Sequence, residues 1–361
     1  MLDKSDFIAK LKEELMCYNE KFSKEDVYDQ FEKFVNNKQS LRDAIEAGIF
    51  QYDYVKYETL FEGTLFEEGI QTIVELCRNG YKVNRERFTD ILCNSYPQIA
   101  RGLESQTQLC WLEGDAFDIP RNDLAVKKAF RVIGDLIENS FKPYALFVNE
   151  LRALIQNKNA NQKKLGMVVD ALINYEGVFK TLYKELLLDI SISQWRNIAD
   201  HGSYENTEYG VVVIYGTNDE YKKIFSLQDL KILIYTLDTL LYMHKTAYSL
   251  VTIDYIDILK DVFSDSKRKE ETWNDNLLSQ IVETSFSYGF ILNKIEKKSD
   301  IWFVEVETHV EQEQQLLTKY CSTIAQFLGE CKLTIYRHNK VEYVVHYTQK
   351  RLEILKYKVS C

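Results

Sequence analysis

The chain has 361 residues, of which 45% are hydrophobic and 28% charged, an ordinary balance for soluble globular domains. Its formal net charge of -10 disfavours a general nucleic-acid coat protein, because such proteins draw most of their affinity from Lys and Arg at phosphates. A site for one single-stranded loop stays compatible with this charge, since stacking and a few local cations suffice there.

No part of the sequence has the composition of a membrane span or a signal peptide. Apolar runs stay below about 18 residues, and residues 1–22 alternate acidic and basic side chains along an amphipathic helix. We therefore expect a cytoplasmic protein without membrane contact. The seven cysteines form no C-x-x-C pair and the five histidines no H-x-x-x-H motif, so we expect reduced thiols, no metal and no cofactor.

Residues 1–104 predict a helical N-terminal domain. The chain has only three prolines and fourteen glycines, which favours long helices. Short amphipathic stretches such as 24–37 and 66–78 alternate with a dense scatter of aromatic side chains. Residues 85–97 have a generic helix-turn-helix pattern, and we interpret the region as a helical domain or partner surface and not as a reader of DNA.

Residues 105–258 predict a helical bundle with four main helices. The first two are expected over Leu124–Asn139 and Pro143–Asn157, the second with proline in its first turn. After a polar linker, apolar residues at helical spacing predict one long helix over Leu165–Leu188. Residues 189–193 interrupt the pattern.

The next segment, Ser191–Gly202, predicts a short capped helix. Ser191 with Gln194 matches a capping box, and Gly202 is an expected helix stop. At about 100° per residue, four polar side chains fall within one arc of roughly 140°, opposite the apolar Trp195. They are those of Arg196, Asn197, Asp200 and His201. Such an arc faces a cleft, a partner or water, and the pattern does not choose among the three.

A small β-insert and a closing helix follow this segment. Tyr209–Tyr215 is β-branched and aromatic, residues 216–219 have turn chemistry, and Glu220–Phe225 can return as a second strand, so we predict a hairpin. Ser226 opens the closing helix with a second capping-box pattern, and its apolar spacing continues to about residue 250.

Residues 259–361 predict a small α+β domain of unknown role, for which recognition or regulation is a hypothesis from position alone. Two pairs of strands flank one amphipathic helix. In chain order the predicted elements are the strands Ser285–Ile295 and Ile301–Thr308, the helix Gln312–Leu328, and the strands Lys332–Tyr336 and Val341–Tyr347.

The pattern Arg196-Asn197-x-x-x-His201 resembles the signature of the HEPN family (higher eukaryotes and prokaryotes nucleotide-binding), in which a polar residue is favoured directly after the Arg. The flanking order is also similar: a long helix, the signature helix ending in His-Gly, a small β-insert and a closing helix, over about residues 124–258. Asp200 departs from the apolar or small residue often seen at its position in the family.

The resemblance implies a metal-independent endoribonuclease that acts on single-stranded or loop RNA. Arg196, Asn197 and His201 are then the catalytic residues. The His201 imidazole suits proton transfer, and the Arg196 guanidinium suits two phosphate oxygens. Asn197 orients the imidazole or holds a substrate oxygen. Asp200 and Tyr204 are accessory: Asp200 orients Arg196 or tunes His201, and Tyr204 stacks on a base or covers the end of the bundle from a loop.

One histidine cannot easily be acid and base in the same step, and the resemblance implies a homodimer in which two signature helices meet across a two-fold axis. The implied products carry a 2′,3′-cyclic phosphate and a 5′-hydroxyl. The implied role is that of a toxin or phage-defence effector, with outer domains suited to a regulatory protein partner.

Residue types alone also allow a structural interpretation. His201 before Gly202 is a common helix ending, and Arg196 with Asp200 can be a surface ion pair. The alternative functions are a non-catalytic helical dimerisation, interaction or nucleotide-binding module, and the companion of an enzyme that modifies a nucleotide or tRNA end. Short cationic runs such as Lys163–Lys164 are expected to be solvated surface, and His244 is expected to be a packed histidine.

Overall fold

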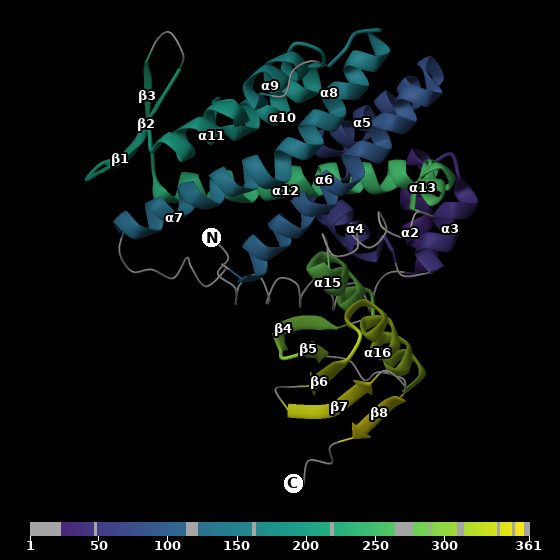
Figure 1. Ribbon diagram of the computed structural model, residues 1–361. Coiled ribbons are helices and arrows are strands. Elements are labelled where there is room, and N and C mark those ends of the chain that lie inside the picture. Colours follow the sequence, from purple (N-terminus) through teal and green to yellow (C-terminus); the bar gives the residue numbers. More distant parts are fainter. Residues whose placement is uncertain are drawn as a thin grey trace. The chain divides into compact units, whose positions relative to one another are not determined.

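The computed structural model describes residues 23–46, 49–112, 122–160, 164–216, 220–263, 277–288, 290–308, 314–337, 340–348 and 351–356. Within these residues the fold is mainly α-helical with two small sheets, which confirms the predicted fold class (Figure 1). Among the described residues the chain divides into two compact units: the first includes residues 31–40 and those from 56 to 263, and the second includes residues 23–30, 41–55 and those from 277 onward. None of the described helices is long and apolar enough to cross a membrane.

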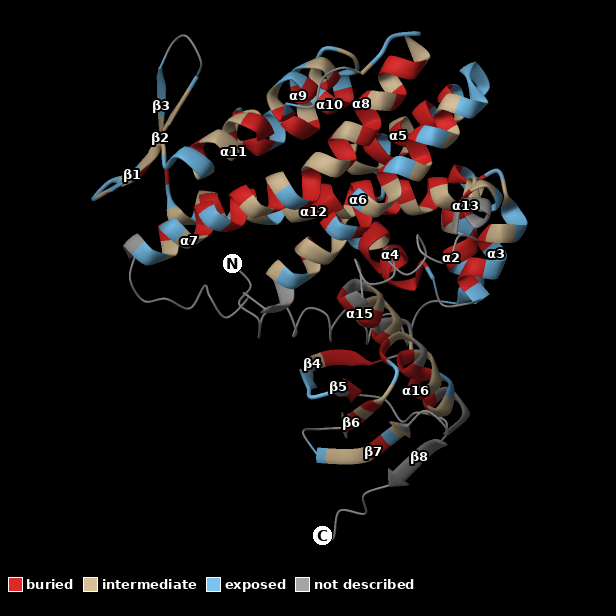
Figure 2. Ribbon diagram, in the orientation of Figure 1, coloured by how far each residue is buried: buried red, intermediate tan, exposed pale blue. Residues whose placement is uncertain are grey.

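Long helices build the first unit. They are α5 (Leu65–Val83), α6 (Arg85–Leu112), α7 (Asn122–Asp135), α8 (Lys142–Ile155) and α12 (Leu227–Asp254). α12 packs against α5 and α7, and α8 packs against α5 and α6. Buried residues line α8 and α12, because both pack against several neighbours (Figure 2). α6 crosses residue 104, the predicted domain boundary, and belongs to the same unit as α8 and α12.

Shorter α-helices also occur in the described residues before 264. They are α2 (Lys24–Phe31), α3 (Lys38–Glu46), α4 (Gln51–Lys56), α9 (Leu165–Ile173), α10 (Gly177–Tyr183), α11 (Ile192–His201) and α13 (Ile256–Phe263). Of these, residues 24–30 of α2, 41–46 of α3 and 51–55 of α4 belong to the second unit. The helix predicted over residues 1–22 lies outside the described residues.

Two predicted helix boundaries in the first unit are wrong. α7 and α8 are joined without a break by a π-helical segment, η4 (Leu136–Phe141), which changes the hydrogen-bond register just before Pro143 instead of ending the helix. Conversely, the single helix predicted over residues 165–188 is divided into α9, α10 and a 3-10 turn. Asn174 ends α9, where its side-chain amide donates to the Asp170 carbonyl (2.8 Å), and Leu188 ends the segment at a positive φ of 59°.

The β-insert has three strands where a two-stranded hairpin was predicted. β1 (Tyr204–Thr207), β2 (Gly210–Tyr215) and β3 (Tyr221–Phe225) are antiparallel in that order. β2 and β3 confirm the predicted pair. Tyr204 therefore begins a strand and does not lie in a loop. Gly210 has φ 131°, and a Cβ there would lie 2.7 Å from the Phe225 carbonyl oxygen, so this turn requires glycine.

The second unit contains a five-stranded sheet in the order β4-β5-β6-β7-β8. Its elements are α15 (Leu277–Ser287), β4 (Ile291–Lys298), β5 (Ile301–Thr308), α16 (Gln314–Leu328), β6 (Cys331–Arg337), β7 (Lys340–Thr348) and β8 (Arg351–Lys356). β5 and β6 are parallel and are connected through α16. The other neighbouring strand pairs of this sheet are antiparallel. The strand predicted from Ser285 is wrong at its start, because residues 285–287 belong to α15.

Candidate functional site

The candidate site begins on α11, whose apolar side is anchored in the first unit. Trp195 is fully buried, and its indole Nε1 donates to the carbonyl oxygen of Leu187 (2.9 Å). Ile198 is buried one turn below. The helix ends at Gly202 with φ 63°, as predicted. Packing of this side therefore leaves the polar arc of α11 on the outside.

The beginning of α11 differs from the prediction in its hydrogen bonds. Ser191 stands at the N-cap, but its side chain makes no capping bond and its Oγ lies 3.2 Å from the Oγ of Ser193. The Gln194 side chain accepts instead from the backbone N–H of Gly216 (3.4 Å). The predicted capping box is thus absent, and Gln194 ties the helix to the β-insert.

Arg196 is held by carboxylates on two sides. Its Nε lies 2.8 Å from Oδ2 of Asp200 and 3.1 Å from Oε2 of Glu138 in η4, and its Nη1 donates to Oδ1 of Asn197 (3.3 Å). The other oxygen of Glu138 pairs with Lys142. These side chains are each about one-third exposed, so each pair contributes only about 0–1 kcal/mol. A competing anion can displace such contacts.

Arg196 and Asn197 open onto a cavity of about 410 Å³. Three separate segments line it: Glu138 and Lys142, then residues 164–167 at the start of α9, then Ser193, Arg196 and Asn197 of α11. Lys164 is exposed, as predicted, and lines the same cavity as Arg196; Lys163 lies outside the described residues. Three cations and one carboxylate line the cavity; because Asp200 also pairs with Arg196, one positive charge remains in excess, and this favours an anionic ligand.

A second cavity of about 410 Å³ adjoins the first. Glu138 and Lys142 line both cavities, and Arg101 of α6 lines only the second one. The ion pair between Glu138 and Lys142 therefore belongs to the wall between two polar cavities.

His201 lies outside the residues that line these cavities. It is the last residue of α11 and is exposed, and no described side chain makes a hydrogen bond with it. Asp200, the residue before His201, is exposed and lies close to Gly134 of α7. A Cβ placed on Gly134 would lie 3.3 Å from Oδ1 of Asp200. Within one chain, His201 and Arg196 are thus both on α11, but His201 does not line the cavity that Arg196 shares with Lys142 and Lys164.

Tyr204 covers the end of the bundle. Its ring stacks on Phe130 of α7, with centroids 3.9 Å apart and planes 12° from parallel. Burial raises the pKa of its hydroxyl, which stays protonated at neutral pH. Because Phe130 covers one face of the Tyr204 ring, that face cannot stack on another planar group.

His244 of α12 is buried, as predicted. Its Nε2 lies 3.1 Å from the hydroxyl of Tyr183, and the Tyr144 ring stacks on it with centroids 5.4 Å apart. Burial lowers the pKa of His244 to about 3, so the imidazole is neutral in the folded protein. His244 is a core residue.

Comparisons of this chain with family models, with curated proteins and with solved structures give no match.

Proposed function

We propose that the chain is a metal-independent endoribonuclease of the HEPN type that acts on single-stranded or loop RNA. The observation that carries this proposal is the cavity shared by Arg196, Asn197, Lys142 and Lys164, at the side of a helix that ends in an exposed His201. The cations suit an RNA phosphate, and the volume suits about one phosphate and its sugar rather than a duplex.

The chemistry requires one exchange of partners at Arg196. A phosphate that enters the cavity replaces Glu138 beside the guanidinium, which then stabilises the charge that develops on the nonbridging oxygens. In the homodimer described next, one His201 imidazole accepts the proton of the 2′-hydroxyl while the hydroxyl oxygen attacks phosphorus. The bond from phosphorus to the 5′-oxygen breaks, and the second His201, in its protonated form, donates a proton to that oxygen. The products are a 2′,3′-cyclic phosphate and a 5′-hydroxyl.

A homodimer completes this proposal, because a second histidine can protonate the leaving oxygen. Exposed apolar side chains of the first unit support such an assembly: Ile224 of β3 and Ile232 at the start of α12 are 61% and 49% exposed. In this proposal the protein acts in the cytoplasm as a toxin or phage-defence effector, under control of a regulatory protein. Light scattering gives the molar mass of the parent and of Ile224→Glu and so tests the dimer. The introduced carboxylate should weaken dimerisation of the variant.

The direct test uses purified protein, total RNA and tRNA in excess EDTA, followed by mapping of the new ends. The parent should cut and leave cyclic phosphates, whereas Arg196→Ala and His201→Ala should not. His346→Ala is the matched control, since His346 is an exposed histidine of β7 in the other unit, and it should cut like the parent. Cleavage by both site variants would refute the assignment.

A second candidate is a non-catalytic interaction module. The contacts of Arg196 with Glu138 and Asp200 favour it, because an ion-pair network is a sufficient reason for an arginine at this position. In that case Arg196→Ala and His201→Ala leave self-association and partner binding nearly unchanged, and the parent does not cut RNA under any of the conditions above.

A further inference from the structure

A third cavity, of about 620 Å³, lies in the first unit away from α11. It forms where α5 ends, α6 begins and α12 passes into α13. The lining residues are Asn36, Arg78, Tyr81, Lys82, Arg85, Asp254, Tyr255, Asp257 and Ile258. Its volume falls in the usual range for a small-molecule site, and its lining combines cations with aromatic rings.

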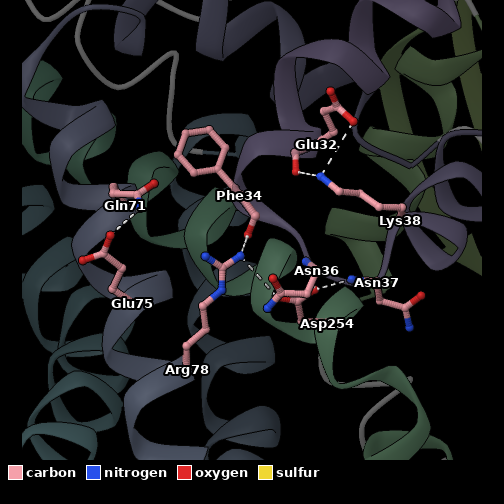
Figure 3. Close-up of polar contacts among 9 residues, drawn as sticks. All are labelled: Glu32, Phe34, Asn36, Asn37, Lys38, Gln71, Glu75, Arg78 and Asp254. Carbon is pink, nitrogen blue, oxygen red and sulfur yellow. Dashed lines mark hydrogen bonds and ion pairs between the residues drawn. The ribbon is translucent and has the colours of Figure 1, made fainter.

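One wall of the cavity is fixed by Asp254, whose side chain is only 4% exposed. Its Oδ1 accepts from the backbone N–H groups of Asn36 (2.6 Å) and Asn37 (2.9 Å), and its Oδ2 lies 3.7 Å from Arg78. Figure 3 shows Arg78 between this carboxylate and the carbonyl oxygen of Phe34, to which it donates (2.7 Å). The charge of Asp254 is thus compensated within the wall, and Arg78 is held in place.

Two further cations stand at the rim. Lys82, in the last turn of α5, is exposed and has no hydrogen-bond or ion-pair partner among the described residues. The exposed Arg85 places its guanidinium 5.6 Å from the centroid of the Tyr81 ring. The carboxylate of Asp257 also lines the cavity. Asp254 balances Arg78, and Asp257 offsets one of the two remaining cations. The lining therefore keeps an excess of one positive charge.

Aromatic rings form another part of the lining. Tyr255 lies 5.0 Å from Tyr81 and 4.7 Å from the buried Phe88, centroid to centroid. Tyr81 and Tyr255 are both partly exposed at the cavity. Packed aromatic rings beside exposed cations suit a ligand with a planar ring at one end and a negative charge at the other.

We propose that this cavity binds a nucleoside monophosphate, with its phosphate on Lys82 and Arg85 and its base against Tyr81 and Tyr255. The site is separate from the cavity of Arg196 and does not depend on the proposed ribonuclease activity. The phosphate could come from a free nucleotide, inorganic phosphate or the end of an RNA strand, and the size of the cavity favours the free nucleotide.

The test is isothermal titration of the full chain with AMP, GMP, CMP and UMP. At least one should bind saturably, and the double substitution Lys82→Gln, Arg85→Gln should weaken it at least about tenfold, because both charged contacts to phosphate are lost. Tyr255→Leu should also weaken the nucleotide but leave inorganic phosphate unaffected. Lys222→Gln, an exposed lysine of β3 outside the cavity, should bind like the parent.

Three results would overturn the proposal. They are the absence of saturable binding by all four nucleotides, binding of inorganic phosphate as tight as that of the best nucleotide, and tight binding of a short single-stranded RNA without binding of the mononucleotides. Arg196→Ala separates this site from the ribonuclease proposal, since it should abolish cleavage and leave nucleotide binding intact. Both rim side chains are exposed, so thermal melting of the double variant should match that of the parent.

Discussion

The neutral, buried His244 should make the first unit sensitive to acid. Its imidazole lies among aromatic rings of α8, α10 and η4, namely those of Tyr144, Tyr183 and Phe141. An unfolded histidine takes up a proton near pH 6.5, whereas burial lowers the pKa of His244 to about 3. Between these values the unfolded state binds one more proton than the folded state, so stability rises with pH through this range and is fully present above it.

The size of the effect follows from the pKa difference. Each unit of pH below 6.5 removes about 1.4 kcal/mol of the free energy of unfolding until the folded pKa is reached. Acidification from about pH 7.5 to about pH 4.5 should therefore remove about 2.7 kcal/mol through this histidine alone. Carboxylates add their own dependence, so the contribution of His244 must be measured as a difference.

His244→Gln provides that difference, because the glutamine amide can form a hydrogen bond with the Tyr183 hydroxyl but does not titrate in this range. Urea unfolding of His244→Gln should be followed by circular dichroism at several pH values. The variant should lose less stability in acid than the parent, and the difference between the two slopes of stability against pH should correspond to about one bound proton. His346→Gln, at an exposed histidine, should follow the parent curve. Parallel curves for His244→Gln and the parent would contradict a neutral His244.

Three substitutions test the packing around the site. Trp195→Ala should lower the free energy of unfolding by about 3–5 kcal/mol, since it empties a fully buried position and leaves the Leu187 carbonyl without its donor; overlapping urea curves would refute this. Gly102→Ala should lower the free energy of unfolding by about 1–3 kcal/mol, because the added Cβ would lie 3.1 Å from the carbonyl oxygen of Asn139 in η4. An unchanged melting curve would show that α6 and η4 can move apart at this contact. Tyr209→Ala, at an 81% exposed side chain, should stay within about 0.5 kcal/mol, and a larger loss would reveal packing of this ring.

Local signals in the sequence predicted several boundaries well. Ser226 and Asp229 form the expected capping box, with Ser226 N–H donating to Asp229 (2.7 Å) and Asp229 N–H to Ser226 (3.1 Å). Gly202 ends α11 as expected, and β5 has the predicted bounds Ile301–Thr308. In each case the determining atoms lie within a few residues of one another.

Errors arose where a pattern is shared by different structures. The apolar spacing through 165–188 is continuous, because α9 and α10 both bury residues at helical intervals, and the break depends on the backbone of Asn174 and Leu188. Strand β1 has the polar sequence Tyr-Glu-Asn-Thr, which gives no alternation signal, and it forms because β2 offers a free edge.

The surroundings of the candidate site could not be predicted from the sequence. Arg196, Asn197 and His201 were found from one short motif, but Glu138 is 58 residues from Arg196 and reaches it only because η4 packs against α11. Lys164 carried the pattern of ordinary surface charge. Composition does not reveal which charges converge on one cavity.

The position of Asp254 has a consequence for the order of folding. Its carboxylate holds the backbone of Asn36, 218 residues earlier in the chain, so this contact is among the most non-local in the first unit. During synthesis, residues 31–40 leave the ribosome long before α12 is complete. Until α12 is complete, the backbone N–H groups of Asn36 and Asn37 lack the acceptor that they have in the folded chain.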